Sequence, residues 1–363
     1  MGRTEAPRLP LLGTRIGSGQ LLDPAPTCRE PAPSLQVPHE EIPAMVTRRT
    51  LNRLIGGACA LATTGGFTTR TVASSASDIA FAPAPPDIWD SHGSVRRAGG
   101  RLHYATLGTP GDQPPVVLLH KLGGWVADWR GVAPALAKDR LVIAIDLPGH
   151  GASTWDGAPP EVQSVHETAM LVRGTLEELG RTMGFSKVHL AGSSLGGCVA
   201  IALAALCPQL VERLALPSCV LGTARTWDEV MAKEAGQAGM FTPKGDPLPS
   251  AAALSRAVFH LDNAPRIAAE QNTSRRIAGR WIRPQERGVA LTDFPTLMRQ
   301  VEAPTLLLYG ERDTFFLIYR QEAEAQLRDV RSVILPDASG FPVQDQPAAT
   351  GAALAAFLAG QAN

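Results

Sequence analysis

Ser194 is the residue whose type and surroundings point most directly to chemistry, because it is the central residue of a Gly-x-Ser-x-Gly pattern between Gly192 and Gly196. The apolar run 188–191 precedes the pattern, and an alanine-rich helical run, 195–206, follows it. A strand that turns this tightly into a helix strains the backbone of the central residue, and the two glycines leave room for the turn. The pattern predicts that Ser194 is a nucleophile whose hydroxyl stands clear of a sheet.

The helix expected to begin at Leu195 adds electrostatic support to this prediction. Its first backbone N–H groups and the positive end of its dipole face any oxyanion that forms beside Ser194. Leu195 N–H is therefore a candidate oxyanion donor.

The elements around this turn alternate between strand and helix. Four apolar runs have the character of buried parallel strands, namely 116–119, 141–145, 188–191 and 214–216. Helical periodicity appears over 129–137 and 167–179, and the strands 305–309 and 332–335 alternate with helices near 318–327 and 348–358. Two short runs, 94–97 and 101–107, predict an antiparallel edge hairpin. The fold class is α/β, with a mostly parallel, doubly wound sheet.

An insertion at about 222–301 interrupts this alternation. It contains amphipathic helical stretches, such as 228–238 and 250–261, and no strand pattern. Because it lies between two sheet strands, we expect it to cover the carboxyl ends of the strands as a helical cap.

Four motifs follow successive strand units in order, and together they carry a resemblance. They are His120, the segment Asp146-Leu147-Pro148-Gly149-His150-Gly151, the Ser194 turn, and Gly310-Glu311-Arg312-Asp313. This set resembles the α/β-hydrolase superfamily, in particular its cap-bearing serine hydrolases, and the likeness extends over about 94–358.

The resemblance implies roles for individual residues. Ser194 is the expected nucleophile, Asp313 the acid that orients a histidine, and the backbone N–H groups of Leu122 and Leu195 the oxyanion donors. His120 and Trp125 border the oxyanion loop, where Trp125 is a candidate wall of an apolar substrate pocket. From the residues alone, Asp313 could equally be the cap of a following helix.

One expected residue is missing. Members of this superfamily carry a histidine in the loop after the last strand, where this chain has Gly340, and no histidine follows His260. A serine hydroxyl is a poor nucleophile without a base, and removing the histidine of a working triad costs on the order of 10⁶ in kcat. We therefore expect ordinary triad chemistry to fail.

Two residues are candidates for a replacement base. Lys121 stands where the superfamily usually has a glycine, and it could act as a base toward Ser194, bind a ligand as an ammonium, or extend into solvent. His260 lies in the predicted cap and could reach the nucleophile from above, or simply lie on a helix surface.

The leading functional hypothesis is hydrolysis of a carboxylic ester or a related small apolar substrate by Ser194 with a non-standard base. The alternatives are a hydrolase-like protein that only binds its ligand, and non-hydrolytic chemistry in the same pocket. Equal numbers of basic and acidic residues, 34 of each, give no footprint for nucleic acid. No apolar run is long enough for membrane insertion, and no ligand spacing indicates a metal or another cofactor.

The sequence of the N-terminal part indicates an export signal rather than a folded domain. Residues 1–44 are rich in proline, glycine and arginine, so we expect them to be disordered, and translation could begin at Met45. Residues 45–76 combine the pair Arg48 and Arg49 with a weakly apolar stretch, which is typical of a twin-arginine export signal. Residues 77–93 form a proline-rich linker, and 94–363 form the hydrolase domain. The sequence thus predicts a periplasmic or secreted protein.

Overall fold

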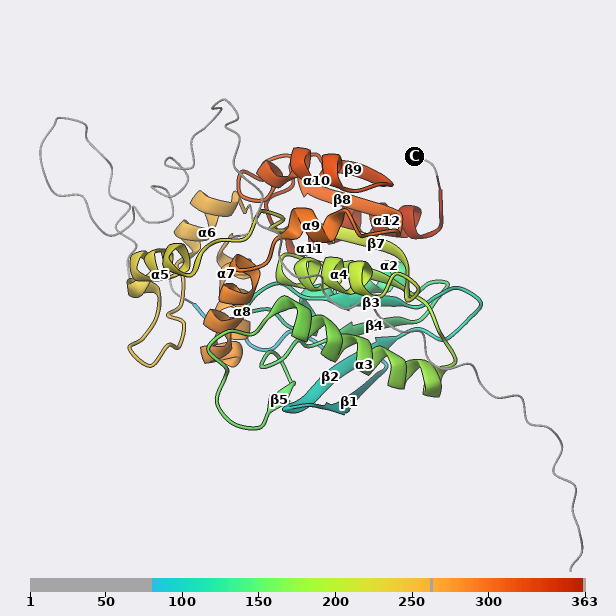
Figure 1. Cartoon of the computed structure of the whole chain (residues 1–363), viewed down its shortest axis with the longest axis horizontal. Helices are drawn as coiled ribbons and strands as arrows, with labels where there is room; N and C mark the ends of the chain where they lie inside the picture. The colour runs from blue at the N-terminus through green and yellow to red at the C-terminus, as the bar shows by residue number, and fades with distance from the viewer. Residues whose placement is uncertain (1–79, 262–263, 362–363) are drawn as a thin grey trace, which may run out of the picture.

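The computed structural model describes residues 80–261 and 264–361, and within these ranges nine strands form one mixed sheet (Figure 1). The strands run in the order β1-β2-β4-β3-β6-β7-β8-β9, and β5 pairs with β2. All pairings from β4 through β9 are parallel, whereas β2 pairs antiparallel with its three neighbours. The predicted parallel sheet with an antiparallel edge hairpin is confirmed.

The strand bounds agree closely with the apolar runs of the sequence. They are β1 (Ser91–Arg97), β2 (Gly100–Leu107), β3 (Val116–Leu119), β4 (Val142–Ile145), β5 (Thr154–Trp155), β6 (Val188–Gly192), β7 (Val211–Pro217), β8 (Thr305–Gly310) and β9 (Val330–Leu335). Strands β3, β4, β6 and β8 are buried along their whole length. Such continuous apolar runs are what a parallel sheet covered on both faces requires.

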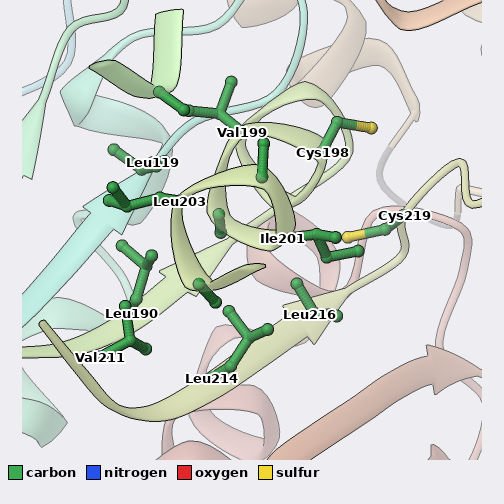
Figure 2. Packing of buried hydrophobic residues seen from close by; sticks show 14 of the residues in the cluster. Leu119, Leu190, Cys198, Val199, Ile201, Leu203, Val211, Leu214, Leu216 and Cys219 are labelled. Atoms are coloured by element: carbon green, nitrogen blue, oxygen red, sulfur yellow. The ribbon is translucent and has the colours of Figure 1, made fainter. Parts of the chain in front are cut away.

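Helices cover both faces of the sheet and divide its core into two clusters. One face carries α3 (Val165–Met183), α4 (Leu195–Leu206), α9 (Phe294–Met298) and α10 (Arg320–Gln326); the other carries the 3-10 helix η2 (Val126–Trp129), α2 (Ala133–Leu136), α11 (Pro342–Asp345) and α12 (Pro347–Leu358). Figure 2 shows α4 against the sheet, with Val199 and Leu203 near Leu119 and Leu190. Every side chain of α4 is buried, which explains its apolar sequence on all sides.

The helix expected over 129–137 is split in the structure. Gly131 and Pro134 separate η2 from the short helix α2, where Pro134 falls within the first turn. Proline is tolerated there because the backbone N–H groups of a first helical turn have no intrahelical partner.

The insertion between β7 and β8 forms helices and no named strand, as the sequence predicts. It contains α5 (Trp227–Gly236), η3 (Ala238–Met240), α6 (Ala252–Phe259), α7 (Ala264–Ala278), η4 (Gly279–Trp281) and α8 (Ile282–Ala290), and the last 3-10 helix, η5 (Leu317–Tyr319), follows β8. In Figure 1 helices α5 to α8 gather beyond one end of the sheet. We refer to residues 222–301 as the cap.

The chain before β1 contacts this cap. The Ala82 N–H donates to the Ala269 carbonyl of α7, and the side chains of Asn272 and Thr273 donate to the carbonyls of Ala80 and Ala82. The predicted linker is therefore attached to the domain from Ala80 onward. The expected disordered segment 1–44 and export signal 45–76 lie outside the described residues.

Along the described ranges, no helix has both the length and the apolarity needed to cross a membrane.

Candidate active site

Ser194 lies on a sharp turn between β6 and α4, in a backbone conformation that side chains rarely adopt. Its φ is 50° and its ψ is −113°. A Cβ on Gly192 would lie 2.2 Å from the Gly196 carbonyl oxygen, and one on Gly196 would lie 2.2 Å from the Leu119 carbonyl oxygen. Neither approach leaves room for a larger residue, which explains both glycines of the pattern. The serine side chain itself remains partly exposed.

Two backbone N–H groups beside this turn are available as donors. Leu195 opens α4, so its N–H belongs to the first turn, where no intrahelical acceptor exists. Leu122 N–H likewise donates to no other residue of the described chain. Leu119 of β3 pairs in register with Gly192 of β6, so the loops after these two strands leave the same edge of the sheet. The geometry suits an oxyanion between the two loops.

Two buried histidines hold the oxyanion loop, residues 120–126, in place. His120 Nε2 accepts from Leu147 N–H at 2.9 Å, and His150 Nε2 accepts from Gly123 N–H at 3.1 Å. Burial lowers the pKa of both side chains, that of His150 to about 3, so both stay neutral. His120 is fully buried and its ring nitrogens bond to backbone groups, so it positions the loop rather than touching a substrate.

Asp146 completes this support. Its Oδ1 accepts from Val126 N–H at 2.7 Å, and its Oδ2 accepts from Ala152 N–H and lies 2.8 Å from His103 Nδ1. Hydrogen bonds thus fix the geometry of the turn after β4.

Asp313 follows β8 and is buried close to the nucleophile turn. Its Oδ1 accepts from the N–H groups of Phe315 and Phe316 at 2.9 and 2.8 Å. Ser218 links it to the nucleophile, because the Ser218 hydroxyl donates to Asp313 Oδ2 at 3.5 Å and the Ser218 carbonyl accepts from Ser194 N–H. Burial raises the pKa of Asp313, and the hydrogen bonds oppose this rise.

Gly340 faces this carboxylate. A Cβ on Gly340 would lie 3.2 Å from Asp313 Oδ1 and 3.5 Å from Phe259 Cδ1 of the cap. The Gly340 N–H donates to the Phe259 carbonyl at 3.1 Å, and the Phe259 ring packs against Phe341 with centroids 4.6 Å apart. The end of cap helix α6 therefore borders the position where the resemblance implies a histidine.

His260 is the next residue of the cap, and the structure brings it to the loop that holds Asp313. Its Nε2 lies 3.3 Å from the hydroxyl of Thr314, the neighbour of Asp313. The backbone of His260 is left-handed, with a φ of 54°, and its side chain is exposed. A histidine from the cap thus lies beside the acid loop.

Lys121 does not extend into solvent. Its side chain is 7% exposed, and Nζ lies 3.5 Å from Asp128 Oδ2. Both residues border a cavity of about 10 Å³, about the space of one water molecule, which Ser193 lines rather than Ser194. Gln344 Nε2 donates to Asp128 Oδ1 at 3.2 Å. The ammonium is thus held in a buried polar group with Asp128 and Gln344.

Trp125, in the oxyanion loop, and Trp129, just after it, differ in environment. Trp125 is half-buried, whereas Trp129 is fully buried in the sheet core and lines the small cavity beside Lys121. Sequence reasoning missed Asp128, the partner of Lys121, and Arg275 of the cap, which contacts the oxyanion loop. Neither position carries a motif, and only the packing of distant segments reveals them.

Among residues 80–261 and 264–361, no cluster of three or more histidine, cysteine or carboxylate side chains could hold a metal ion.

The sequence matches a family model described as alpha/beta hydrolase fold over residues 114–348. It is 30% identical over 252 residues to an esterase from Mycobacterium tuberculosis, covering 66% of this chain and 80% of the esterase. It is 38% identical over 167 residues to the dihydrolipoyllysine-residue acetyltransferase component of an acetoin cleaving system from Pseudomonas putida. That match covers 44% of this chain and only 39% of the relative.

A solved structure gives the same fold. The thermophilic esterase from Thermogutta terrifontis superposes with a TM-score of 0.62 at 22% identity, covering 74% of this chain and 98% of that one. At this identity the likeness concerns the fold alone.

Proposed function

Since the chain belongs to the alpha/beta hydrolase fold family, we propose that it hydrolyses a small carboxylic ester with Ser194 as the nucleophile. One observation carries the proposal: Ser194 stands on a strained turn, with φ at 50°, beside the N–H groups of Leu122 and Leu195, which have no acceptor among the described residues. Backbone strain at a partly exposed serine is typical of a residue kept for chemistry rather than for stability.

The proposed reaction follows from this arrangement. Ser194 Oγ attacks the ester carbonyl and transfers its proton to a base, and the carbonyl oxygen becomes an oxyanion between the two N–H groups. Collapse of this intermediate breaks the bond to the alcohol oxygen, which takes the proton from the base, and leaves an acyl group on Ser194. Water then attacks the acyl group by the same route and releases the acid.

We propose that His260 supplies the base in place of the residue missing at Gly340. His260 lies within hydrogen-bond distance of Thr314, so its imidazole is next to the loop that carries Asp313. The Phe259 carbonyl accepts from Gly340 N–H and holds the adjacent backbone in place. Lys121 is the weaker candidate, because its ammonium is held at Asp128. Catalytic hydrogen bonds often tighten only when substrate binds, so the exposed position of His260 is compatible with this role.

A fluorophosphonate probe tests the nucleophile, because it forms a covalent bond only with an activated serine. We expect the probe to label the protein and the Ser194→Ala variant to lose the label. Ser193→Ala is the matched control, since Ser193 is the neighbouring hydroxyl on the same turn and should leave labelling unchanged. Labelling that persists in Ser194→Ala would refute the proposed nucleophile.

Removing the imidazole tests the base. We expect His260→Ala to lower kcat/KM for a 4-nitrophenyl ester by about 10² to 10⁴, the usual contribution of a general base. His166→Ala changes a histidine on α3, outside the site, and serves as the control. An unchanged kcat/KM in His260→Ala would exclude His260 as the base.

The absence of a histidine at Gly340 favours a second candidate, a protein that binds an ester or acid without turning it over. Under this alternative, the probe does not label Ser194, and an unreactive ester analogue binds equally well to Ser194→Ala. Calorimetric titration of both proteins with the analogue separates the two functions.

We also propose that residues 45–76 direct export through a twin-arginine route, on the basis of the pair Arg48 and Arg49. Replacing both arginines by lysine in the full chain should retain the protein in the cytoplasmic fraction. Equal export of this variant and the natural chain would refute the route.

A further inference from the structure

Arg275 lies on the face of cap helix α7 that is turned toward the oxyanion loop. A Cβ on Gly123 would lie 2.7 Å from Arg275 Cγ and 3.3 Å from Ile282 Cδ1. One turn before Arg275 on the same helix, Gln271 donates to Gln344 of the hydrolase domain at 2.9 Å. Residues one turn apart share a face of a helix, so Arg275 stands over the loop that carries the Leu122 donor.

The guanidinium of Arg275 has no hydrogen-bond or ion-pair partner in the part of the chain that the structure describes, and its Nε is fully buried. Burial lowers its pKa, and only the distant charge of Glu286 opposes this. The Glu286 carboxylate is already paired with Lys233, at 2.6 Å. A buried donor without a partner is costly, so the Nε of this half-buried guanidinium calls for an acceptor such as an anion.

Neighbouring arginines show how this chain ordinarily satisfies such groups. Arg287 makes two hydrogen bonds to the Glu234 carboxylate, at 2.7 and 2.8 Å. Arg130 similarly makes two to Glu270, at 2.8 and 2.9 Å. Both pairs provide the fork geometry that guanidinium and carboxylate share. Arg275 is half-buried like these two but lacks the acid.

We propose that Arg275 binds a carboxylate of the substrate, so that the natural ester carries a free acid group beside its reactive carbonyl. The inference rests on the proposed hydrolase function and narrows its substrate class to anionic esters, such as a monoester of a dicarboxylic acid. The acid group would lie at the guanidinium, beyond the point where the Arg275 side chain packs on Gly123, the residue next to the Leu122 oxyanion donor. Guanidinium and carboxylate form a strong bidentate pair when water is excluded.

The test compares two esters that differ mainly in charge, 4-nitrophenyl hydrogen glutarate and neutral 4-nitrophenyl pentanoate. Arg275→Met should lower kcat/KM for the glutarate ester by about 10- to 100-fold, as expected for a lost charged hydrogen bond, and change the pentanoate value less than threefold. Arg276→Met is the control, because Arg276 is the exposed next residue and stacks on Phe81. Equal changes with both esters would overturn the proposal.

A binding measurement separates this inference from the proposed reaction. Glutarate itself is titrated into Ser194→Ala, with and without Arg275→Met, by calorimetry. Binding that Arg275→Met removes supports the anion site even if neither ester is hydrolysed. If the protein hydrolyses esters but glutarate binds equally well to both variants, the site is refuted while the hydrolase function stands.

Arg275→Lys is a second variant at this position, which keeps the charge but loses the planar fork. We expect it to retain an intermediate preference for the glutarate ester. Unchanged melting temperatures of both variants show that they fold. A preference equal to that of the natural chain would argue against the fork contact.

Discussion

Replacing Lys121 by methionine should destabilise the fold, because it leaves Asp128 as an unpaired buried charge. The two side chains are 7% and 6% exposed, and their charged atoms lie 3.5 Å apart. At an effective dielectric constant of about 20, charges at this separation attract by about 5 kcal/mol. Breaking one partner of a buried pair typically costs 3–5 kcal/mol, so we expect a loss of about 4 kcal/mol in the free energy of unfolding.

Urea denaturation at pH 7 measures this loss directly, and thermal melting should show a fall on the order of 10 °C. The double variant Lys121→Met and Asp128→Asn removes both charges, so most of the lost stability should return. The difference between the single variants and the double variant gives the coupling energy of the pair.

The same double variant distinguishes a positioning role of Lys121 from a role as the base. If the pair only holds the oxyanion loop, the double variant should label with fluorophosphonate nearly as fast as the natural chain. If Lys121 takes the proton of Ser194, labelling should stay lost although stability returns. A loss below about 1 kcal/mol in Lys121→Met would refute the reasoning, because it would mean that water already reaches Asp128.

Two further predictions follow from the turn and from the buried histidines. Gly196→Ala places a Cβ 2.2 Å from the Leu119 carbonyl oxygen, so the turn must shift. We therefore expect the rate of fluorophosphonate labelling to fall at least 100-fold. A labelling rate within tenfold of that of the natural chain would contradict this. Burial lowers the pKa of His150 to about 3, so from pH 6.5 down to about 3 the unfolded chain binds a proton that the native state does not. Stability then falls with pH by about 1.4 kcal/mol per unit for this group, and the stability difference between the natural chain and His150→Gln should narrow by about 2 kcal/mol between pH 7 and pH 5 in urea titrations. A constant difference would show that His150 is not the group that titrates.

The sequence predicts those parts of the fold where local pattern and tertiary packing agree. Helix α4 begins and ends where the alanine-rich run does, because all its side chains are buried and its start is set by the turn at Ser194. The central parallel strands are equally clear, since each is a short apolar run bounded by loops. The prediction of a single helix over 129–137 was wrong, because Gly131 and Pro134 disfavour a continuous helix despite the helical spacing of the apolar residues.

The surroundings of the candidate site are less accessible to sequence reasoning. The sequence leaves three roles open for Lys121. Only folding brings it to Asp128 of the 3-10 helix η2 and to Gln344, more than 200 residues away in the chain. Arg275 looks like any arginine of a surface helix, since its burial depends on where the cap packs. The sequence identifies His260 as a histidine of the cap, but its position beside Thr314 is set by where α6 ends.

The attachment of Ala80 and Ala82 to helix α7 has a practical consequence for anyone who shortens this protein. A recombinant chain starting at Asp87 would keep every strand of the sheet, yet Asn272 and Thr273 would each lose an acceptor, and Arg276 would lose the ring of Phe81. Trimming at residue 79 avoids this damage. The contacts of the cap with Ala80 and Ala82 therefore extend the structure to be kept up to eleven residues ahead of the first strand at Ser91.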